Sequence, residues 1–247
     1  MSLGFVHATE TNHLALSLVG GGRVTQLDSG KVVTSDVDPL FIYNWAFGIR
    51  RAFDPKPAMA AFEAAGRPYT HVMASPSSRR DLPEILAGAG FERFETQSFR
   101  RTTGTGAGAP GLEQITRDEA ERFADAVLSA PVGGHRHDHR RGAYVRRVTD
   151  GRARAYRTAD WEGVFLLFDD GPTTQLCHLA VRPDAQGSGL GRRLLEGARG
   201  LAGAGRGLWL FTAADGPGDR TAAAAGWERN HTAGNWVLPP GEIGLGS

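Results

Sequence analysis

One stretch of the sequence, Cys177 to Leu195, constrains the fold more than any other, because an apolar run leads through a glycine-rich turn into an amphipathic segment. The run predicts a strand, and the segment predicts a helix over residues 189–201 with its leucines on one face. A helix N-terminus presents unpaired N–H groups and a partial positive charge. Gly187, Gly189 and Gly191 carry no Cβ atoms that would keep an anion from those groups. The stretch therefore predicts a pyrophosphate-binding turn.

Two other phosphate-binding turns have a different spacing. The dinucleotide fingerprint is G-x-G-x-x-G, whereas this turn is G-x-G-x-G, and no acidic residue stands about 20 positions further on to hold a ribose. The nucleoside-triphosphate loop ends in Gly-Lys-Ser/Thr, whereas Gly191 is followed by Arg192 and Arg193. The spacing matches neither of these turns, and a phosphate- or nucleotide-binding enzyme is kept only as a further interpretation of the chain.

The residues around these glycines resemble the acyl-CoA-binding segment of the GNAT superfamily of N-acyltransferases. In that family a strand with Ala-Val or a similar pair is followed by a proline and then by Gln/Arg-x-x-Gly-x-Gly/Ala, and here Gln186, Gly189 and Gly191 fill the last part. The resemblance extends from about Leu112 to Leu238. It implies acetyl-CoA as co-substrate. It also implies the cofactor-binding residues, which are Leu179, Ala180 and Val181 along the pantetheine arm and Gln186, Gly187, Ser188, Gly189, Leu190, Gly191 and Arg192 around the pyrophosphate.

The same resemblance implies an α/β (α+β) fold, in which helices flank a mixed, mostly antiparallel sheet whose fourth and fifth strands splay apart. Hydrophobic periodicity places strands of the C-terminal half at 154–158, 163–168, 176–181, 208–212 and 235–238. Helices are expected after a capping box at Thr116, over 189–201 and over 217–225. In the N-terminal half we expect strands at 40–49 and 69–74 and helices at 57–65 and 82–89.

A repeat with an offset of 136 residues crosses the chain. The segment that ends Gly90-Phe-Glu-Arg93 resembles the segment that ends Gly226-Trp-Glu-Arg229. In both, an Ala-rich stretch ends at a glycine suited to the left-handed position after a helix. The repeat predicts two tandem GNAT-like domains. We expect a degenerate domain without the CoA turn over 1–101, a flexible Gly-rich linker over 102–111 and a catalytic domain over 112–247.

The sequence identifies the catalytic residues less clearly than it identifies the CoA-binding turn. Many family members carry a tyrosine four residues before the Gly-Phe pair, which protonates the leaving thiolate, and Ala222 stands at that position here. Gln175 stands near the place where some relatives have a glutamate base, and an amide is a poor base. We expect His178 or Glu162 to act as the general base, and histidine titrates close to neutral pH. Either residue could instead be a strand or turn residue without a catalytic role.

The segment His135-Arg-His-Asp-His139 allows two interpretations. Its spacing could ligate a metal if the loop turns inward, but no second cluster completes such a site, so we expect a polar loop and no metal. Family resemblance places this region beside the acceptor. Its arginine and histidine content would then favour an acceptor that carries a carboxylate or a phosphate.

Charge and composition exclude several classes of protein. The formal net charge of +1 creates no strong field that would favour nucleic acid or an acidic membrane. A single cysteine, Cys177, allows no intramolecular disulfide. No apolar run approaches the roughly 20 residues of a membrane span, and the N-terminus lacks a signal-peptide pattern. We therefore expect a cytoplasmic protein without a nucleic-acid or membrane partner.

Together these features predict an enzyme, an N-acetyltransferase that moves an acetyl group from acetyl-CoA to a primary amine of a small molecule or peptide by direct attack in a ternary complex. The alternative is a non-catalytic acyl-CoA-responsive binding protein, which the alanine at position 222 keeps open. The sequence fixes neither the identity of the acceptor nor the oligomeric state.

Overall fold

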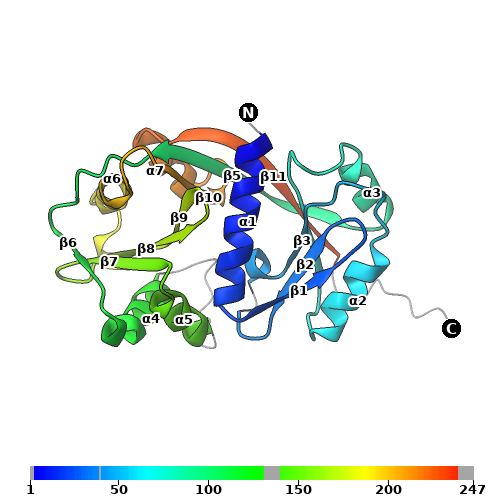
Figure 1. The fold of residues 1–247 in the computed structure, drawn as a ribbon, viewed down its shortest axis with the longest axis horizontal. Helices are drawn as coiled ribbons and strands as arrows, with labels where there is room; N and C mark the ends of the chain where they lie inside the picture. Colours follow the sequence, from blue (N-terminus) through cyan, green and yellow to red (C-terminus); the bar gives the residue numbers. More distant parts are fainter. Residues whose placement is uncertain (1–2, 39, 131–139, 239–247) are drawn as a thin grey trace.

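The strands of the protein form an eleven-stranded sheet with helices on both faces (Figure 1). The computed structural model describes residues 3–38, 40–130 and 140–238. The strand order is β1-β2-β3-β4-β11-β5-β10-β9-β8-β7-β6, and all neighbours are antiparallel except the pairs β3–β4 and β9–β10. The expected mixed, mostly antiparallel sheet flanked by helices is confirmed.

Within its described residues, the N-terminal half contributes five strands and three α-helices. In chain order these elements are α1 (Leu3–Val19), β1 (Gly22–Gln26), β2 (Lys31–Ser35), the 3₁₀ turn η1 (Phe41–Tyr43), β3 (Trp45–Phe47), α2 (Lys56–Ala64), β4 (Thr70–Ala74), α3 (Leu82–Gly88) and β5 (Glu92–Thr103).

The C-terminal half contributes six strands and four α-helices among the described residues. They are β6 (Leu112–Gln114), the 3₁₀ turn η2 (Arg117–Glu119), α4 (Ala120–Ser129), α5 (Arg141–Thr149), β7 (Ala153–Thr158), β8 (Gly163–Asp170), β9 (Thr173–Val181), the 3₁₀ turn η4 (Pro183–Ala185), α6 (Leu190–Leu201), β10 (Gly207–Ala213), α7 (Pro217–Ala224) and β11 (Glu228–Leu238). The expected capping box is present, because the Thr116 side chain faces the N3 backbone and the Glu119 carboxylate accepts from the Thr116 N–H at 2.9 Å.

The two halves exchange their last strands. β5 ends the N-terminal half but lies between β10 and β11, whereas β11 ends the C-terminal half but lies between β4 and β5 (Figure 1). Neither half completes its part of the sheet without a strand from the other. The chain is therefore one continuous sheet, in which each half depends on the other for a central strand.

The repeat seen in the sequence has a structural counterpart. β5 begins at Glu92 and β11 begins at Glu228, which is 136 residues later. Before each strand a glycine adopts positive φ, 85° at Gly90 and 78° at Gly226, as expected for a left-handed position after a helix. Gln97 of β5 lies opposite Ala233 of β11, also 136 residues apart, so this pair marks the centre of the exchange.

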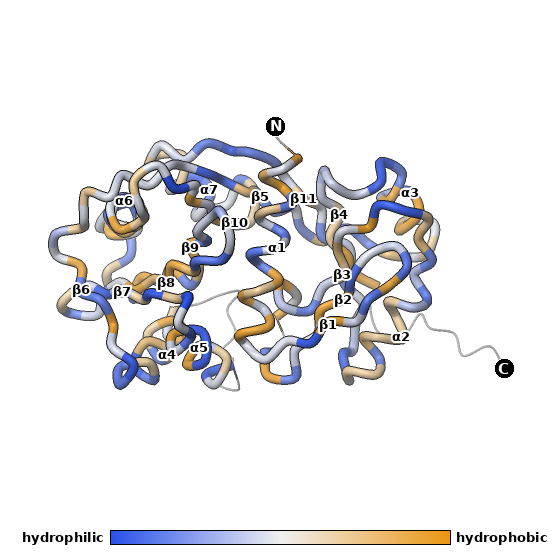
Figure 2. The backbone as a smooth tube through the Cα atoms, viewed as in Figure 1, coloured by the Kyte–Doolittle hydropathy of each residue, from blue (hydrophilic) through white to orange (hydrophobic). Residues whose placement is uncertain are grey.

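Apolar residues alternate between the two faces of β8, which is why this strand has a continuous apolar sequence. Leu166 and Phe168 pack with α4 and α5, whereas Phe165 and Leu167 pack with α6 and α7. Figure 2 shows β8 as strongly apolar, whereas β5 and β11 are mostly hydrophilic.

Helix α1 lies across the middle of the sheet, between the two halves (Figure 1). Its Leu16 packs in the same cluster as α4 and α5. The Asn12 amide donates to the carbonyls of Asp170 and Thr173, at 3.1 and 3.2 Å, which are in the C-terminal half. Helix α1, which is part of the N-terminal half in sequence, therefore also packs against and hydrogen-bonds to the C-terminal half.

The segment expected to be a flexible linker is fixed instead. Thr102 and Thr103 belong to β5. The N–H of Gly104 donates to Arg206 at 2.9 Å, and the N–H of Gly108 donates to Gly200 at 2.9 Å. A Cβ atom at position 200 would lie 1.9 Å from the Gly108 carbonyl oxygen, so the close approach requires a glycine. The expectation of flexibility over 102–111 is wrong, because these backbone groups are hydrogen-bonded around the end of α6.

Among residues 3–38, 40–130 and 140–238, none of the helices combines the length and the apolar character that crossing a bilayer would require.

Candidate functional site

Strands β9 and β10 separate part-way along their length. They pair in parallel only at three positions, and the last pair is Gln175 with Trp209. Beyond that point Leu179, Ala180 and Val181 of β9 have no partner on β10 within the described residues. The backbone groups that face this gap are suited to pairing with an extended amide-containing ligand.

A β-bulge in β9 sets which side chains face each side of the sheet. Val164 pairs with Ala180 and Leu166 with Cys177, so two residues of β9 lie opposite Phe165 alone. One of these two residues is His178, which has a φ of 52°. Bulges commonly re-aim side chains next to functional sites.

Strand alternation places His178 on the opposite face of the sheet from Leu179 and Val181. Leu179 and Val181 pack against the cluster that contains α6. The His178 ring instead lies edge-on to Tyr144, with ring centroids 4.8 Å apart, on the face covered by α4 and α5. Its Nε2 atom is buried and has no hydrogen-bond partner among the described residues. Burial, followed by the charges of Arg147 and Arg140, holds the pKa of His178 well below its usual value, so the ring is in the basic, neutral form at pH 7.

The structure does not bring the second candidate base to the same place. Glu162 lies at the start of β8, where its Oε1 accepts from Arg182 Nη2 at 3.1 Å. The Arg182 N–H also donates to the Glu162 carbonyl at 2.7 Å. The Glu162 carboxylate is thus held by Arg182, whereas His178 Nε2 has no partner among the described residues, so His178 is the better placed of the two.

The glycine-rich turn has the geometry of an anion-binding turn. Gly187 and Gly189 adopt φ of 80° and 81°, and a Cβ at either would meet no atom within 4 Å. Gly189 is the N-cap of α6, whose first residue, Leu190, is buried against the sheet. A Cβ at Gly191 would first meet Thr221 at 3.8 Å. Open space in front of a 12-residue helix fits a pyrophosphate.

The polar side chains of the turn form hydrogen bonds to other groups of the protein. Gln186 Nε2 donates to the Val181 carbonyl at 3.1 Å, and Ser188 Oγ donates to the Ala185 carbonyl at 2.7 Å. Arg192 Nε donates to Glu196 at 2.9 Å on the exposed face of α6. These three side chains are therefore hydrogen-bonded to other groups of the chain.

The N-terminal half also reaches this site, which the sequence did not specify by residue. The ring of Tyr43 lies 6.2 Å from that of His178, and His13 of α1 lies within hydrogen-bond distance of Gln175, at 3.1 Å. Ala222 of α7 is fully buried in the cluster that contains α6, and an alanine has no proton to give to a leaving group. The sequence signal for this role of α1 is its buried polar residues, which include Glu10, Asn12 and His13.

No group of three or more His, Cys, Asp or Glu side chains within 3–38, 40–130 and 140–238 could hold a metal ion. The segment from His135 to His139 lies outside the described residues.

Comparison with known proteins agrees with this geometry. Residues 111–221 match the model of the "Acetyltransferase (GNAT) family", so this part of the chain is similar to the acetyltransferase domains of that family. That family uses acetyl-CoA generally. No curated protein matches the sequence.

Several solved structures share the fold. A GCN5-related N-acetyltransferase from Kribbella flavida has a TM-score of 0.65 at 16% identity, covering 95% of this chain and 96% of its own. A tandem GNAT protein from the clavulanic acid biosynthesis pathway has a TM-score of 0.54 at 18% identity, covering 92% of this chain and 88% of its own. A GCN5-related N-acetyltransferase from Sphaerobacter thermophilus has a TM-score of 0.54 at 13% identity, covering 88% and 76%.

Proposed function

Starting from a GNAT-class domain over residues 111–221, we propose that this protein is an N-acetyltransferase that moves an acetyl group from acetyl-CoA to a primary amine by direct attack in a ternary complex. The observation that carries the proposal is the gap between β9 and β10 next to the glycine-rich N-terminus of α6. One ligand with a pyrophosphate and an extended diamide arm satisfies both features.

The residues present fit acetyl-CoA along this path. The backbone of Leu179, Ala180 and Val181 would pair with the pantetheine arm. The N–H groups of the turn would hold the pyrophosphate, and the turn comprises Gln186, Gly187, Ser188, Gly189, Leu190, Gly191 and Arg192.

In the reaction the amine nitrogen forms a bond to the thioester carbon, the carbon–sulfur bond breaks, and the thiol leaves with a proton. An alkylamine is almost wholly protonated at pH 7, its pKa being about 10.4, so a proton must be removed before or during attack. His178 is the proposed acceptor of that proton, directly or through a water. Because Ala222 cannot protonate the thiolate, we assign that proton to water.

The N-terminal half is proposed to be a decayed copy of the catalytic half. The offset of 136 residues between β5 and β11 and their reciprocal exchange support a duplication. Between β3 and α2 the chain has no Gly-rich turn comparable to residues 187–191. We therefore place CoA in the C-terminal half only.

The experiment is release of free thiol from acetyl-CoA by the full-length protein against a panel of primary amines, with the acetylated product identified by mass spectrometry. Turnover that depends on the amine supports the proposal. The competing proposal, a non-catalytic acyl-CoA-responsive binding protein, is favoured by the alanine at 222. Tight binding of acetyl-CoA by calorimetry, with no thiol release for any amine, would establish that alternative instead.

A further inference from the structure

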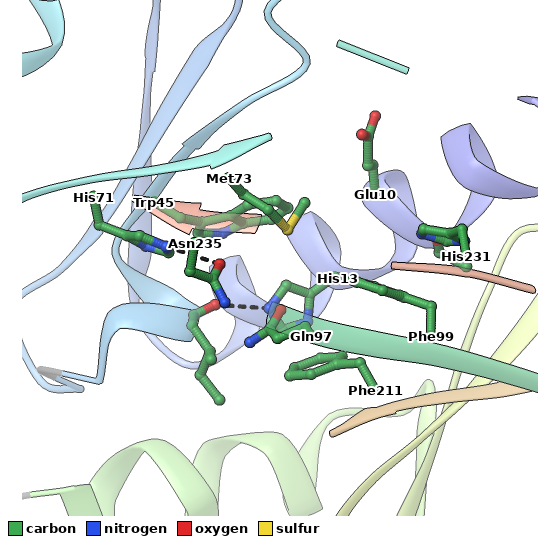
Figure 3. Close-up of a pocket in the computed structure, with 12 residues that line it drawn as sticks. Glu10, His13, Trp45, His71, Met73, Gln97, Phe99, Phe211, His231 and Asn235 are labelled. Carbon is green, nitrogen blue, oxygen red and sulfur yellow. Dashed lines mark hydrogen bonds between the residues drawn. The ribbon is translucent and has the colours of Figure 1, made fainter. Parts of the chain in front are cut away.

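A small cavity lies beneath α1, where the two halves exchange strands (Figure 3). Its interior has room for about one water molecule, so it holds neither an amine acceptor nor a part of CoA. The end of β9 that leads into the CoA turn (residues 186–192) is built differently. There a network of charged side chains is centred on Arg182, the residue between β9 and η4.

Arg182 joins the start of β8 to the residues that precede the CoA turn. Its Nη2 donates to Glu162 Oε1 at 3.1 Å, and its Nε donates to Asp184 Oδ1, in η4, at 2.6 Å. Its backbone N–H donates to the Glu162 carbonyl at 2.7 Å. These three hydrogen bonds fix the direction in which the chain leaves β9.

The backbone that carries Glu162 is anchored on both faces of the sheet. On the face covered by α4, the buried ring of Trp161 lies 4.3 Å from the guanidinium carbon of Arg122. On the other face, Gly163 packs so closely on α6 that a Cβ atom would lie 2.7 Å from Leu194 Cδ1. Glu162 therefore starts from a position that is fixed relative to α6, the helix on which CoA is proposed to bind.

The CoA turn benefits from such support because three of the five residues 187–191 are glycines. Glycine has more conformational freedom than any other residue, so ordering it costs more entropy. Gly187 and Gly189 both have positive φ, 80° and 81°. A turn that is held in this conformation before CoA arrives loses less entropy when CoA binds, and it therefore binds CoA more tightly.

We propose that Glu162 is a positioning residue for CoA: through Arg182 it fixes residues 182–186 in the course that presents the CoA turn to the pyrophosphate. The inference rests on the proposed placement of CoA at this turn. It assigns Glu162 a role in cofactor affinity rather than in proton transfer.

Electrostatics alone predicts the opposite effect of removing this carboxylate. Glu162 and the pyrophosphate of CoA are both negative, so loss of the Glu162 charge would by itself leave CoA binding unchanged or make it tighter. Loss of a positioning contact would weaken CoA binding instead. The direction of the change in affinity therefore distinguishes the two.

The first test is calorimetry of CoA with the full-length protein and its Glu162→Gln variant, which keeps the size of the side chain and removes its charge. Glu162 and Arg182 are 35% and 41% exposed, so the variant should fold. We expect its Kd for CoA to rise about threefold, the scale of a partly exposed ion pair. A Kd equal to or below that of the wild type would overturn the proposal.

The matched control is Glu196→Gln. It removes the same charge from α6, but Glu196 pairs with Arg192 within the helix, at 2.9 Å. We expect its Kd for CoA to be unchanged or lower. A rise equal to that of Glu162→Gln would mean that any loss of negative charge near α6 weakens binding, and it would overturn the specific role of Glu162.

Arg182→Met completes a double-mutant cycle. It should raise the Kd for CoA more than Glu162→Gln does, by about fivefold, because it breaks the contacts with both carboxylates. The double variant should bind CoA as Arg182→Met does, since Glu162 acts through Arg182. Additive losses would mean that Glu162 affects CoA by another route, contrary to the proposal.

Kinetics separate positioning from catalysis. In acetyl transfer, Glu162→Gln should raise the KM for acetyl-CoA about threefold with little change in kcat. A fall in kcat with an unchanged KM would assign Glu162 to the chemical step and refute its positioning role. If the wild-type protein binds no CoA in the calorimeter, the placement of CoA is wrong, and the proposed function fails together with this role.

Discussion

Arg147 of α5 donates from Nη1 to Asp38 Oδ2 at 3.0 Å, and both side chains are fully buried. Arg140 donates from Nε to the other oxygen of Asp38 at 2.8 Å. The Arg147 guanidinium also lies 3.8 Å from the centre of the Tyr43 ring. This one carboxylate therefore joins the loop after β2 to α5 and fixes Tyr43 beside His178.

We predict that Asp38→Asn lowers the free energy of unfolding by about 3–5 kcal/mol, because it leaves two buried guanidinium groups without their anion. The matched control is Asp36→Asn. Asp36 pairs with Arg23 at 2.6 Å, but the two side chains are 48% and 77% exposed, so its loss should change stability by about 1 kcal/mol or less. Urea unfolding of the two variants measures the difference. Equal losses would show that the buried pair does not hold the halves together.

The sequence predicted the C-terminal half well because its elements obey simple rules. The helix expected at 189–201 spans Leu190–Leu201, and the strand expected at 163–168 spans Gly163–Asp170. The helix has its buried leucines on one face, and the strand is buried along most of its length. The turn between β9 and α6 was also predictable, because only glycine adopts positive φ freely at Gly187 and Gly189.

Helix α1 and the exchange of β5 and β11 were not predictable in the same way. α1 is buried between the halves, so Thr9, Glu10 and Asn12 are buried and the usual apolar stripe is absent. β5 and β11 are mostly polar, and their places depend on partners far away in the chain. The residues of a strand and its sequence neighbours do not indicate which distant strand it will pair with. The expected strand at 235–238 covered only the end of β11, which spans Glu228–Leu238.

Gly189→Asp should weaken acetyl-CoA binding by several kcal/mol while the protein stays folded. The new carboxylate would face the proposed pyrophosphate at the N-terminus of α6, and like charges repel strongly where solvent is scarce. The control is Gly171→Asp, because Gly171 also has positive φ, 64°, and open space around its Cβ position, but it lies in the β8–β9 turn. Calorimetry measures the affinity of each variant for acetyl-CoA, and only the Gly189 variant should bind it more weakly. Unchanged affinity in the Gly189 variant would remove the turn from the CoA site.

His178→Ala should lower kcat by about 10²-fold or more, the usual scale for loss of a general base, with little change in the affinity for acetyl-CoA. Glu162→Gln is the paired variant, and it should retain most of the rate because Glu162 is held by Arg182. Rates are compared across pH 6 to 9. If the Glu162 variant loses the rate and the His178 variant keeps it, the role of base passes to Glu162. If both keep it, the base is a water or a residue on another element.

The stability of the protein should rise with pH between about 4 and 6.5. Burial lowers the pKa of His13 and of His231 to about 4 each, and that of His178 is lowered as well. Between pH 4 and 6.5 these rings are protonated in the unfolded chain and neutral in the folded one. Because the unfolded state then binds more protons, the free energy of unfolding increases with pH by up to roughly 1.4 kcal/mol per unit for each histidine. Glu95 opposes this trend, since burial raises its pKa.

His231 offers a clean variant for measuring this dependence. Its ring stacks on Phe99 with centroids 4.3 Å apart, so His231→Phe keeps an aromatic ring in place and removes one titrating group. We expect urea unfolding of the wild-type protein at a series of pH values from 4.5 to 7 to give a rising free energy that levels off above about pH 6.5. In the variant, the slope of the free energy of unfolding against pH should be smaller by roughly 1.4 kcal/mol per pH unit, which is the contribution of one bound proton. A variant slope equal to that of the wild type would mean that His231 has an ordinary pKa in the folded protein.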